Sequence, residues 1–211
     1  MANLHTPQLT LGDDSRVNVK NRMTLRATLL TAAISFSLQA ATPVVRDHLA
    51  GNTLLIVRHA EKPPHGRELT PIGQARANAY IHYFEPFNEI GLKLRVNALY
   101  SGSDSPDSIR PRLTLEPLSR ATGLPLDSSI SSKDPNALVT LLRMQPHGNH
   151  PLIAWRHRSI LALLTALGAS PDLIPAGTWP DDTYDWVIVL TFDNAGHLHS
   201  SRLIQENLKV P

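Results

Sequence analysis

The segment Arg58-His59-Ala60-Glu61 combines a nucleophile, an anion-binding group and a carboxylate within four residues. A neutral imidazole such as that of His59 is nucleophilic near pH 7, and the neighbouring guanidinium can hold an anion. The segment follows the apolar residues 54–57, a run typical of a buried parallel strand. Because ligands bind at the carboxyl ends of such strands, this position favours a functional site. A strand that ends at the surface with solvated charges is the structural alternative.

Two further segments place basic side chains after expected strands. Arg110 and Arg112 come after residues 96–100 and a serine-rich loop, and Arg156-His157 comes directly after residues 151–155. The carboxyl ends of parallel strands lie along one edge of a sheet, so two arginines and two histidines should converge there. No aspartate stands at these strand ends to neutralise them. Such a pocket suits phosphate, which arginine binds in a bidentate way and helix amino termini bind through N–H groups.

The elements that must position these side chains alternate between strand and helix. We expect strands at residues 52–57, 96–100, 151–155 and 186–192, with residues 199–204 pairing back as an antiparallel strand. We expect helices from Thr70-Pro71 towards residue 84, from Pro111 to about residue 122, from Asp134-Pro135 through residue 142, and over residues 159–167. This alternation predicts an α/β fold, a three-layer sandwich whose mostly parallel sheet carries helices on both faces.

Four stretches in order resemble the histidine phosphatase superfamily, the phosphoglycerate-mutase-like group of phosphatases and mutases. They are Arg-His-Ala after the first strand, Leu-Thr-x-x-Gly-x-x-x-Ala from residue 69, Arg-x-x-x-Thr from residue 110, and a strand followed by x-His at residue 157. Together they span the body of the chain, residues 52–192. The resemblance implies a phosphoglycerate-mutase-like fold and a small bacterial-type member of the superfamily.

The resemblance also implies roles for four side chains. His59 would accept the phosphoryl group as a phosphohistidine, with no metal or other cofactor. Arg58 and Arg110 would bind the non-bridging oxygens and neutralise charge in the transition state. His157 would line the other side of the phosphate and donate a hydrogen bond when protonated. Arg112 is the alternative to Arg110, which is preferred because it stands four residues before the threonine of the pattern.

The source of the leaving-group proton departs from the family pattern. Arg158 follows His157, where acid phosphatase and phytase relatives have an aspartate that protonates the leaving group. The acidic motif that mutase-like relatives use is not recognisable. Glu61 is a candidate general acid, and a salt bridge with Lys62 or a nearby arginine is its structural alternative. An enzyme without a strong acid would favour good leaving groups, such as phosphohistidine, acyl phosphate or aryl phosphate.

These observations predict a metal-independent phosphohydrolase that acts on a small phosphorylated substrate and releases inorganic phosphate. A phosphomutase of the same superfamily and a non-catalytic phosphate-binding module are the alternatives. A metal site is a further alternative, because two close histidine pairs occur, His147-x-x-His150 and His197-x-His199. Both pairs lie in loops or turns without a carboxylate to complete a ligand set, so surface histidines are the preferred interpretation.

Charge and cysteine content narrow the classes of function. The net charge of +2 comes from residues 1–40, and the remaining residues carry 16 basic and 16 acidic side chains. A neutral body provides no case for a nucleic-acid surface. The absence of cysteine excludes disulfides, thiolate zinc sites and cysteine nucleophiles.

The amino-terminal segment is typical of a secretory signal peptide. Lys20, Arg22 and Arg26 precede a short apolar stretch, residues 27–38, and then small residues at Ala40-Ala41. The stretch is too short for a stable membrane span. We therefore divide the chain into an extension at residues 1–45, with translation starting at Met1 or Met23, and a histidine phosphatase domain at residues 46–211. We expect export to the periplasm or medium, with a cytoplasmic protein as the alternative.

Overall fold

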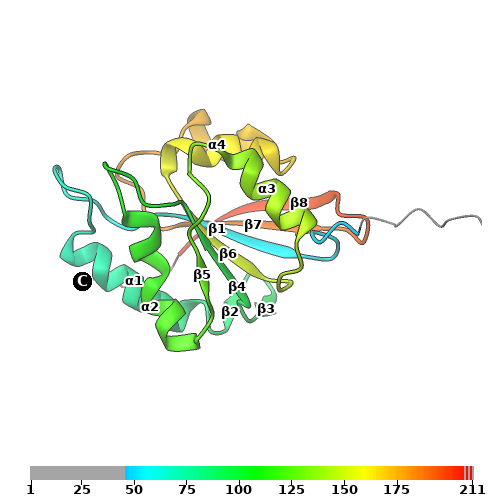
Figure 1. The fold of residues 1–211 in the computed structure, drawn as a ribbon, viewed down its shortest axis with the longest axis horizontal. Helices are drawn as coiled ribbons and strands as arrows, with labels where there is room; N and C mark the ends of the chain where they lie inside the picture. The colour runs from blue at the N-terminus through cyan, green and yellow to red at the C-terminus, as the bar shows by residue number, and fades with distance from the viewer. Residues whose placement is uncertain (1–45, 207, 209, 211) are drawn as a thin grey trace, which may run out of the picture. The chain divides into compact units, whose positions relative to one another are not determined.

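A six-stranded mixed sheet organises the residues that this computed structural model describes, which are 46–206, 208 and 210. The strand order is β5-β4-β6-β1-β7-β8 (Figure 1). The first four strands in this order run parallel, β7 is antiparallel to β1, and β8 is antiparallel to β7. Their bounds are β1 Thr53–Arg58, β4 Ala98–Ser101, β5 Leu126–Asp127, β6 Pro151–Trp155, β7 Trp186–Phe192 and β8 Leu198–Gln205. The predicted signal peptide lies outside the described residues.

Helices cover both faces of the sheet, which confirms the predicted three-layer α/β sandwich. In Figure 1, α1 (Pro71–Tyr83) and α2 (Arg110–Thr122) lie on one side of the sheet. On the other side lie α3 (Pro135–Met144) and α4 (His157–Ala166). None of the described helices is long and apolar enough to cross a membrane.

The central strand β1 shows why both faces need a cover. Leu54 and Ile56 pack into the hydrophobic core beneath α3 and α4, whereas Leu55 and Val57 pack into the core beneath α1 and α2. All four side chains are fully buried. A continuous apolar run is therefore required, and it holds the strand end with Arg58 in place.

The helix boundaries follow the local signals in the sequence. Thr70 caps α1 by accepting a hydrogen bond from the backbone N–H of Gly73, at 3.1 Å, and Asp134 caps α3 in the same way through Ala137. Gly123 ends α2 with φ of 74°, a left-handed conformation that glycine adopts without strain.

Three features differ from the prediction or add to it. Helix α4 begins at His157 rather than at residue 159, so this histidine lies in the first turn of the helix. A small hairpin, β2 (Phe87–Glu89) and β3 (Leu92–Leu94), and the two-residue strand β5 were not expected. Such short strands carry too few residues for a periodic pattern. Two short 3₁₀ turns, Pro171–Leu173 and Pro175–Gly177, precede β7.

Candidate active site

His59 and His157 come together at the carboxyl ends of the adjacent parallel strands β1 and β6. The backbone N–H of His59 donates to the carbonyl of Trp155, at 3.0 Å, which continues the pairing of the two strands. Nε2 of His59 then lies 3.4 Å from Nδ1 of His157, and the rings meet edge to face. Both side chains are buried. The two histidines predicted from separate motifs therefore form one pair.

The outer nitrogen of each ring has its own partner. Nδ1 of His59 donates to the carbonyl of Ala60, at 2.8 Å, so the neutral ring has its lone pair on Nε2. Nε2 of His157 lies 2.7 Å from a carboxylate oxygen of Asp181. These contacts direct the lone pair of His59 towards His157 and into the pocket.

Both imidazoles are neutral at pH 7. Burial and, to a lesser extent, the positive charges of Arg58 and Arg110 lower the pKa of His59 to about 3, against the effect of the Ala60 carbonyl. Burial, Arg58 and Lys62 lower the pKa of His157 to about 4, although Asp181 acts in the opposite direction. A neutral His59 is the form that can attack an electrophile.

Arg58 lies fully buried beneath the segment that connects the 3₁₀ turns to β7. One terminal nitrogen, Nη1, donates to the carbonyls of Pro180, Asp181 and Thr183, and the guanidinium stacks 3.9 Å above the centre of the Tyr184 ring. Nε and Nη2 have no hydrogen-bond partner among the described residues. Burial lowers the pKa of Arg58 to about 10, so the group stays charged with two donors unused.

Arg110 begins α2 and is held by backbone carbonyls. Its Nη1 donates to Gly66, at 2.8 Å, and Nη2 donates to Asp107, at 3.3 Å, while the buried Nε has no partner in the described part of the chain. Burial and the nearby charge of Arg156 lower the pKa of Arg110. Arg112 instead pairs with carboxylates, those of Asp104 and Glu116, and is partly exposed. The geometry favours Arg110 for the site.

Thr114 explains the spacing of the Arg-x-x-x-Thr motif. Its hydroxyl donates to the carbonyl of Arg110 one helical turn earlier, at 2.8 Å, and accepts from the backbone N–H of Ala60, at 2.9 Å. The threonine thus joins the start of α2 to the residue that follows His59.

Glu61 points into a different environment from the histidine pair. Its carboxylate accepts two hydrogen bonds from Nε of Arg76 and forms an ion pair with Nη2, at 2.9 Å. Arg76 also pairs with the buried carboxylate of Glu206, at 2.7 Å, which in turn accepts a hydrogen bond from Tyr80. The salt bridge, which was the structural alternative for Glu61, is therefore what the structure has.

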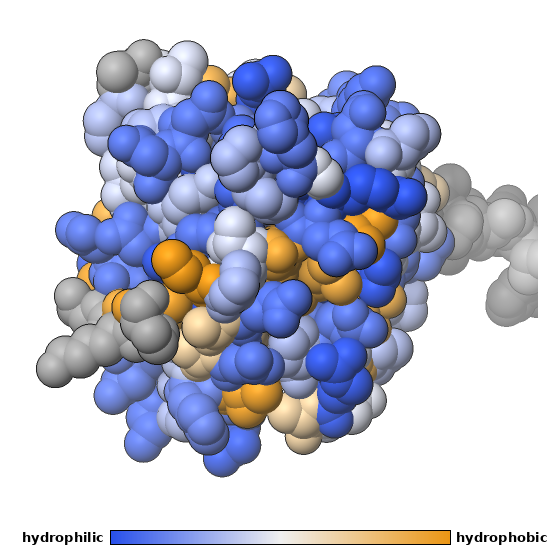
Figure 2. Space-filling view, turned by 90° about the vertical axis from the view of Figure 1, so that its left-hand side faces the viewer, coloured by the Kyte–Doolittle hydropathy of each residue, from blue (hydrophilic) through white to orange (hydrophobic). Residues whose placement is uncertain are grey.

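A cavity of about 360 Å³ opens beside the two histidines. It is lined by His59, His157 and Ser159 together with the cations Lys62, Arg110, Lys133, Arg156 and Arg158. No carboxylate is among the described residues that line it. The loops that follow β1 and β4 project to the left in Figure 1, and Figure 2 faces that side, where hydrophilic side chains dominate around smaller hydrophobic patches.

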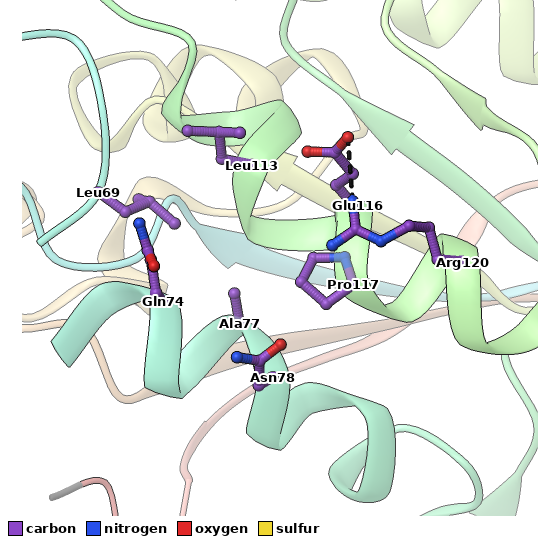
Figure 3. Close-up of a pocket in the computed structure, with 8 residues that line it drawn as sticks. All are labelled: Leu69, Gln74, Ala77, Asn78, Leu113, Glu116, Pro117 and Arg120. Carbon is purple, nitrogen blue, oxygen red and sulfur yellow. Dashed lines mark ion pairs between the residues drawn. The ribbon is translucent and has the colours of Figure 1, made fainter. Parts of the chain in front are cut away.

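A second cavity, of about 250 Å³, lies between α1 and α2, away from the histidines (Figure 3). Gln74 and Asn78 of α1 and Glu116 and Arg120 of α2 supply its polar side chains. The carboxylate of Glu116 pairs with Arg120, at 3.1 Å, so the charges here are balanced. This cavity offers no nucleophile comparable to His59.

The other histidines form no metal centre within the described residues, where no group of three or more potential ligands is found. The ring nitrogens of His147 contact the carbonyls of Gly148 and Leu142, and His150 contacts that of Arg95. Backbone contacts therefore use the ring nitrogens of the first close pair.

Sequence reasoning missed Asp181, Tyr184 and Lys62. These residues reach the site from loops, and Lys62 lies 3.6 Å from Asp181. The acidic run Asp181-Asp182 before β7 was a visible signal, but nothing local indicated that it folds back over Arg58.

No family model and no curated protein matches this chain. Solved structures are similar in fold to it. They include the protein histidine phosphatase SixA complexed with tungstate, with 16% identity, a TM-score of 0.48 and coverage of 71% of this chain and 96% of that chain. Phosphoglycerate mutase from Plasmodium falciparum has 15% identity and a TM-score of 0.49, and the match covers 76% of this chain and 95% of that chain. A phosphoserine phosphatase mutant from Entamoeba histolytica in complex with phosphoserine has 15% identity and a TM-score of 0.46. The match covers 72% of this chain and 96% of that chain.

Proposed function

We propose that this chain is a metal-independent phosphohydrolase of the histidine phosphatase type, with His59 as the phosphoryl acceptor. One observation carries the proposal. The lone pair on Nε2 of His59 faces a cavity that Arg110 also lines, and buried guanidinium nitrogens of Arg110 and of the adjacent Arg58 have no partner among the described residues. Buried donors without partners are costly, and the oxygens of a phosphoryl group would satisfy them.

In the first step, Nε2 of His59 attacks phosphorus. A P–N bond forms, the ester P–O bond breaks, and the leaving oxygen takes its electron pair. The ring becomes positively charged in the phosphohistidine, and the carbonyl of Ala60 stabilises it through the proton on Nδ1. Arg58 and Arg110 stabilise the charge on the equatorial oxygens during the transfer.

In the second step, water attacks the phosphohistidine. The P–N bond breaks and its electron pair returns to Nε2. His157, which protonates the leaving oxygen in the first step, takes one proton from the water, and the other proton stays on the inorganic phosphate that leaves. The enzyme is then ready for a new substrate without a further reactant.

Proton donation to the leaving oxygen restricts the substrates. The carboxylate of Glu61 is ion-paired with Arg76, and Lys62 together with the His157 contact lowers the pKa of Asp181, which disfavours Asp181 as a proton donor. A bound phosphate dianion raises the pKa of the adjacent His157, which makes this imidazole the nearest proton donor. Substrates whose leaving group needs little protonation should therefore react fastest.

The test combines turnover with trapping of the intermediate. Purified protein in EDTA should hydrolyse p-nitrophenyl phosphate, and His59→Ala should lower kcat by about a thousandfold or more. An alkaline quench with ³²P-labelled substrate should trap acid-labile label on the wild type and none on His59→Ala. Arg112→Gln is the matched control, because this arginine is already paired with carboxylates outside the cavity.

Other outcomes would support the other candidates. Binding of inorganic phosphate without turnover of any phosphate ester indicates a binding module. Transfer of the label to a second hydroxyl instead of water indicates a phosphomutase. Loss of wild-type activity in EDTA indicates a metal-dependent reaction.

A further inference from the structure

Besides Arg110, which is assigned to the phosphoryl group, and Lys62, which pairs with Asp181, three further cations line the cavity. They are Lys133, Arg156 and Arg158, which we call the rim cluster. Arg156 precedes α4, Arg158 lies in its first turn, and Lys133 lies in the loop before α3. None of the three forms an ion pair within the described part of the chain.

The charge of the rim cluster is only partly balanced. Arg158 is close enough to Asp181 to lower the pKa of that carboxyl, and Asp181 also contacts Lys62 and His157. Arg156, by contrast, has another cation as its electrostatic neighbour, because its charge lowers the pKa of Arg110. Arg110 and Arg156 both line the cavity, where no carboxylate is among the described lining residues, and cations gathered in this way favour the binding of an anion.

Lys133 is brought to the cavity by a close backbone approach. The N–H of Ser103, just after β4, donates to the carbonyl of Ile130, at 2.8 Å, which holds the loop against the strand end. Gly102 makes this possible, because a Cβ there would overlap the hydroxyl of Ser132. Ser132 is buried at 3% exposure, and the next residue, Lys133, extends outward to the cavity. The position of this lysine thus follows from the packing of the loop.

The cavity is larger and more positive than one phosphoryl group requires. His59, Arg110 and His157 line the cavity and, with the adjacent Arg58, are assigned to that group, and about 360 Å³ is the volume of a small-molecule site. We infer that the rim cluster binds a second anionic group of the same small molecule, so that the substrates are phosphate esters with a further phosphate or carboxylate. This inference rests on the proposed function, since it takes the histidine pair as the place of the scissile phosphoryl group.

Three substrates with a three-carbon chain test the inference. Propyl phosphate has a methyl group at its far end, 2-carboxyethyl phosphate has a carboxylate, and propane-1,3-diyl bisphosphate has a second phosphate. A charged hydrogen bond to the far group should raise kcat/KM for the two anionic substrates at least about tenfold over propyl phosphate. Arg156→Gln and Lys133→Gln should each reduce this ratio, whereas Arg120→Gln, beside the balanced cavity of Figure 3, should not.

A binding measurement separates the subsite from catalysis. Calorimetry with propylphosphonate and propane-1,3-diylbisphosphonate, neither of which can be hydrolysed, should show about tenfold tighter binding of the second compound. The preference should weaken in Arg156→Gln and with added salt, because salt screens charges at an open rim. Equal affinity of the two compounds would overturn the subsite even if p-nitrophenyl phosphate is hydrolysed. A preference for the bisphosphonate without any turnover would support the subsite and contradict the proposed hydrolysis.

Discussion

Nε2 of His59 and Nδ1 of His157 face each other across 3.4 Å, while the outer nitrogen of each ring is held by another group. Because Nδ1 of His59 carries the proton of this ring, the lone pair lies on Nε2 and faces His157. Burial is the largest cause of the low pKa values of both rings, and the positive charge of Arg58 acts in the same direction.

The first prediction concerns the titration of this pair. We expect both imidazoles to remain neutral from pH 8 down to about pH 5, because their pKa values are about 3 and about 4. Nitrogen-15 NMR of labelled histidine measures this, and His59→Gln assigns the His59 signals. Asp181→Asn should lower the pKa of His157 further, since the carboxylate raises it. Titration of both rings near pH 6.5, the value of an unperturbed histidine, would contradict the prediction.

The second prediction separates Arg110 from Arg112. Arg110→Gln should reduce kcat for p-nitrophenyl phosphate by roughly 10²–10³, because one donor to the transition-state oxygens is lost. Arg112→Gln should change kcat less than about threefold, since this side chain contributes only partly exposed ion pairs. Steady-state kinetics of the two variants tests this prediction. A large loss of kcat in Arg112→Gln with little change in Arg110→Gln would assign the phosphate contact to Arg112.

The third prediction concerns the link that Thr114 makes. Thr114→Val keeps the shape of the side chain but leaves the N–H of the buried Ala60 without its acceptor. A buried unpaired donor costs about 1–3 kcal/mol, which lowers the melting temperature by several degrees in a chain of this size. Calorimetry measures the stability, and kcat should fall as well, because Ala60 is adjacent to His59, the proposed nucleophile. Thr122→Val is the matched control, as its hydroxyl contacts the end of the same helix.

The fourth prediction uses the buried carboxylate of Glu206. Burial raises the pKa of Glu206 to about 7, more than Tyr80 and Arg76 lower it. The unfolded value is about 4.3, so the folded state binds more protons between about pH 4.3 and 7. Stability should therefore decrease as pH rises through this window. Chemical denaturation of wild type and Glu206→Gln at pH 5.5 and pH 8 tests this, and the variant should lose this contribution. An unchanged pH dependence in the variant would show that another group is responsible.

The fifth prediction concerns export, which we propose from the sequence. After expression in a bacterial host, the protein isolated from the periplasm should begin near Ala41, because the small residues there are typical of a cleavage site. Amino-terminal sequencing provides the measurement. A start at Met1 or Met23 would contradict export.

Local chemistry made much of the scaffold predictable from the sequence. The bounds of β6 and β7 follow directly from their apolar runs, and the starts of α1 and α3 follow from Thr70-Pro71 and Asp134-Pro135. A cap and a fixed proline φ act within one helical turn, so neighbouring residues suffice to specify them. The order of basic residues after strand ends was also sufficient to identify His59, Arg110 and His157 as candidates.

The surroundings of these candidates depended on the tertiary structure. Arg58 binds carbonyls 122 to 125 residues away, and Asp181 reaches His157 from the same distant segment. Every residue type has a backbone carbonyl, so the sequence does not indicate which carbonyls Arg58 will contact. The partner of Glu61 was equally hard to predict, because the sequence does not single out Arg76 among the arginines.

The sequence by itself determined which chemical groups this protein has at the strand ends, because strand and helix signals are local. Only the tertiary structure decided the charge and the position of these groups. Packing buries His59 and His157, which keeps them neutral, and it brings Lys133, from the loop held against Gly102, to the same cavity as Arg156 at the start of α4. Burial and long-range proximity arise from the whole chain, and these two quantities set the charge and the orientation of every group in the site.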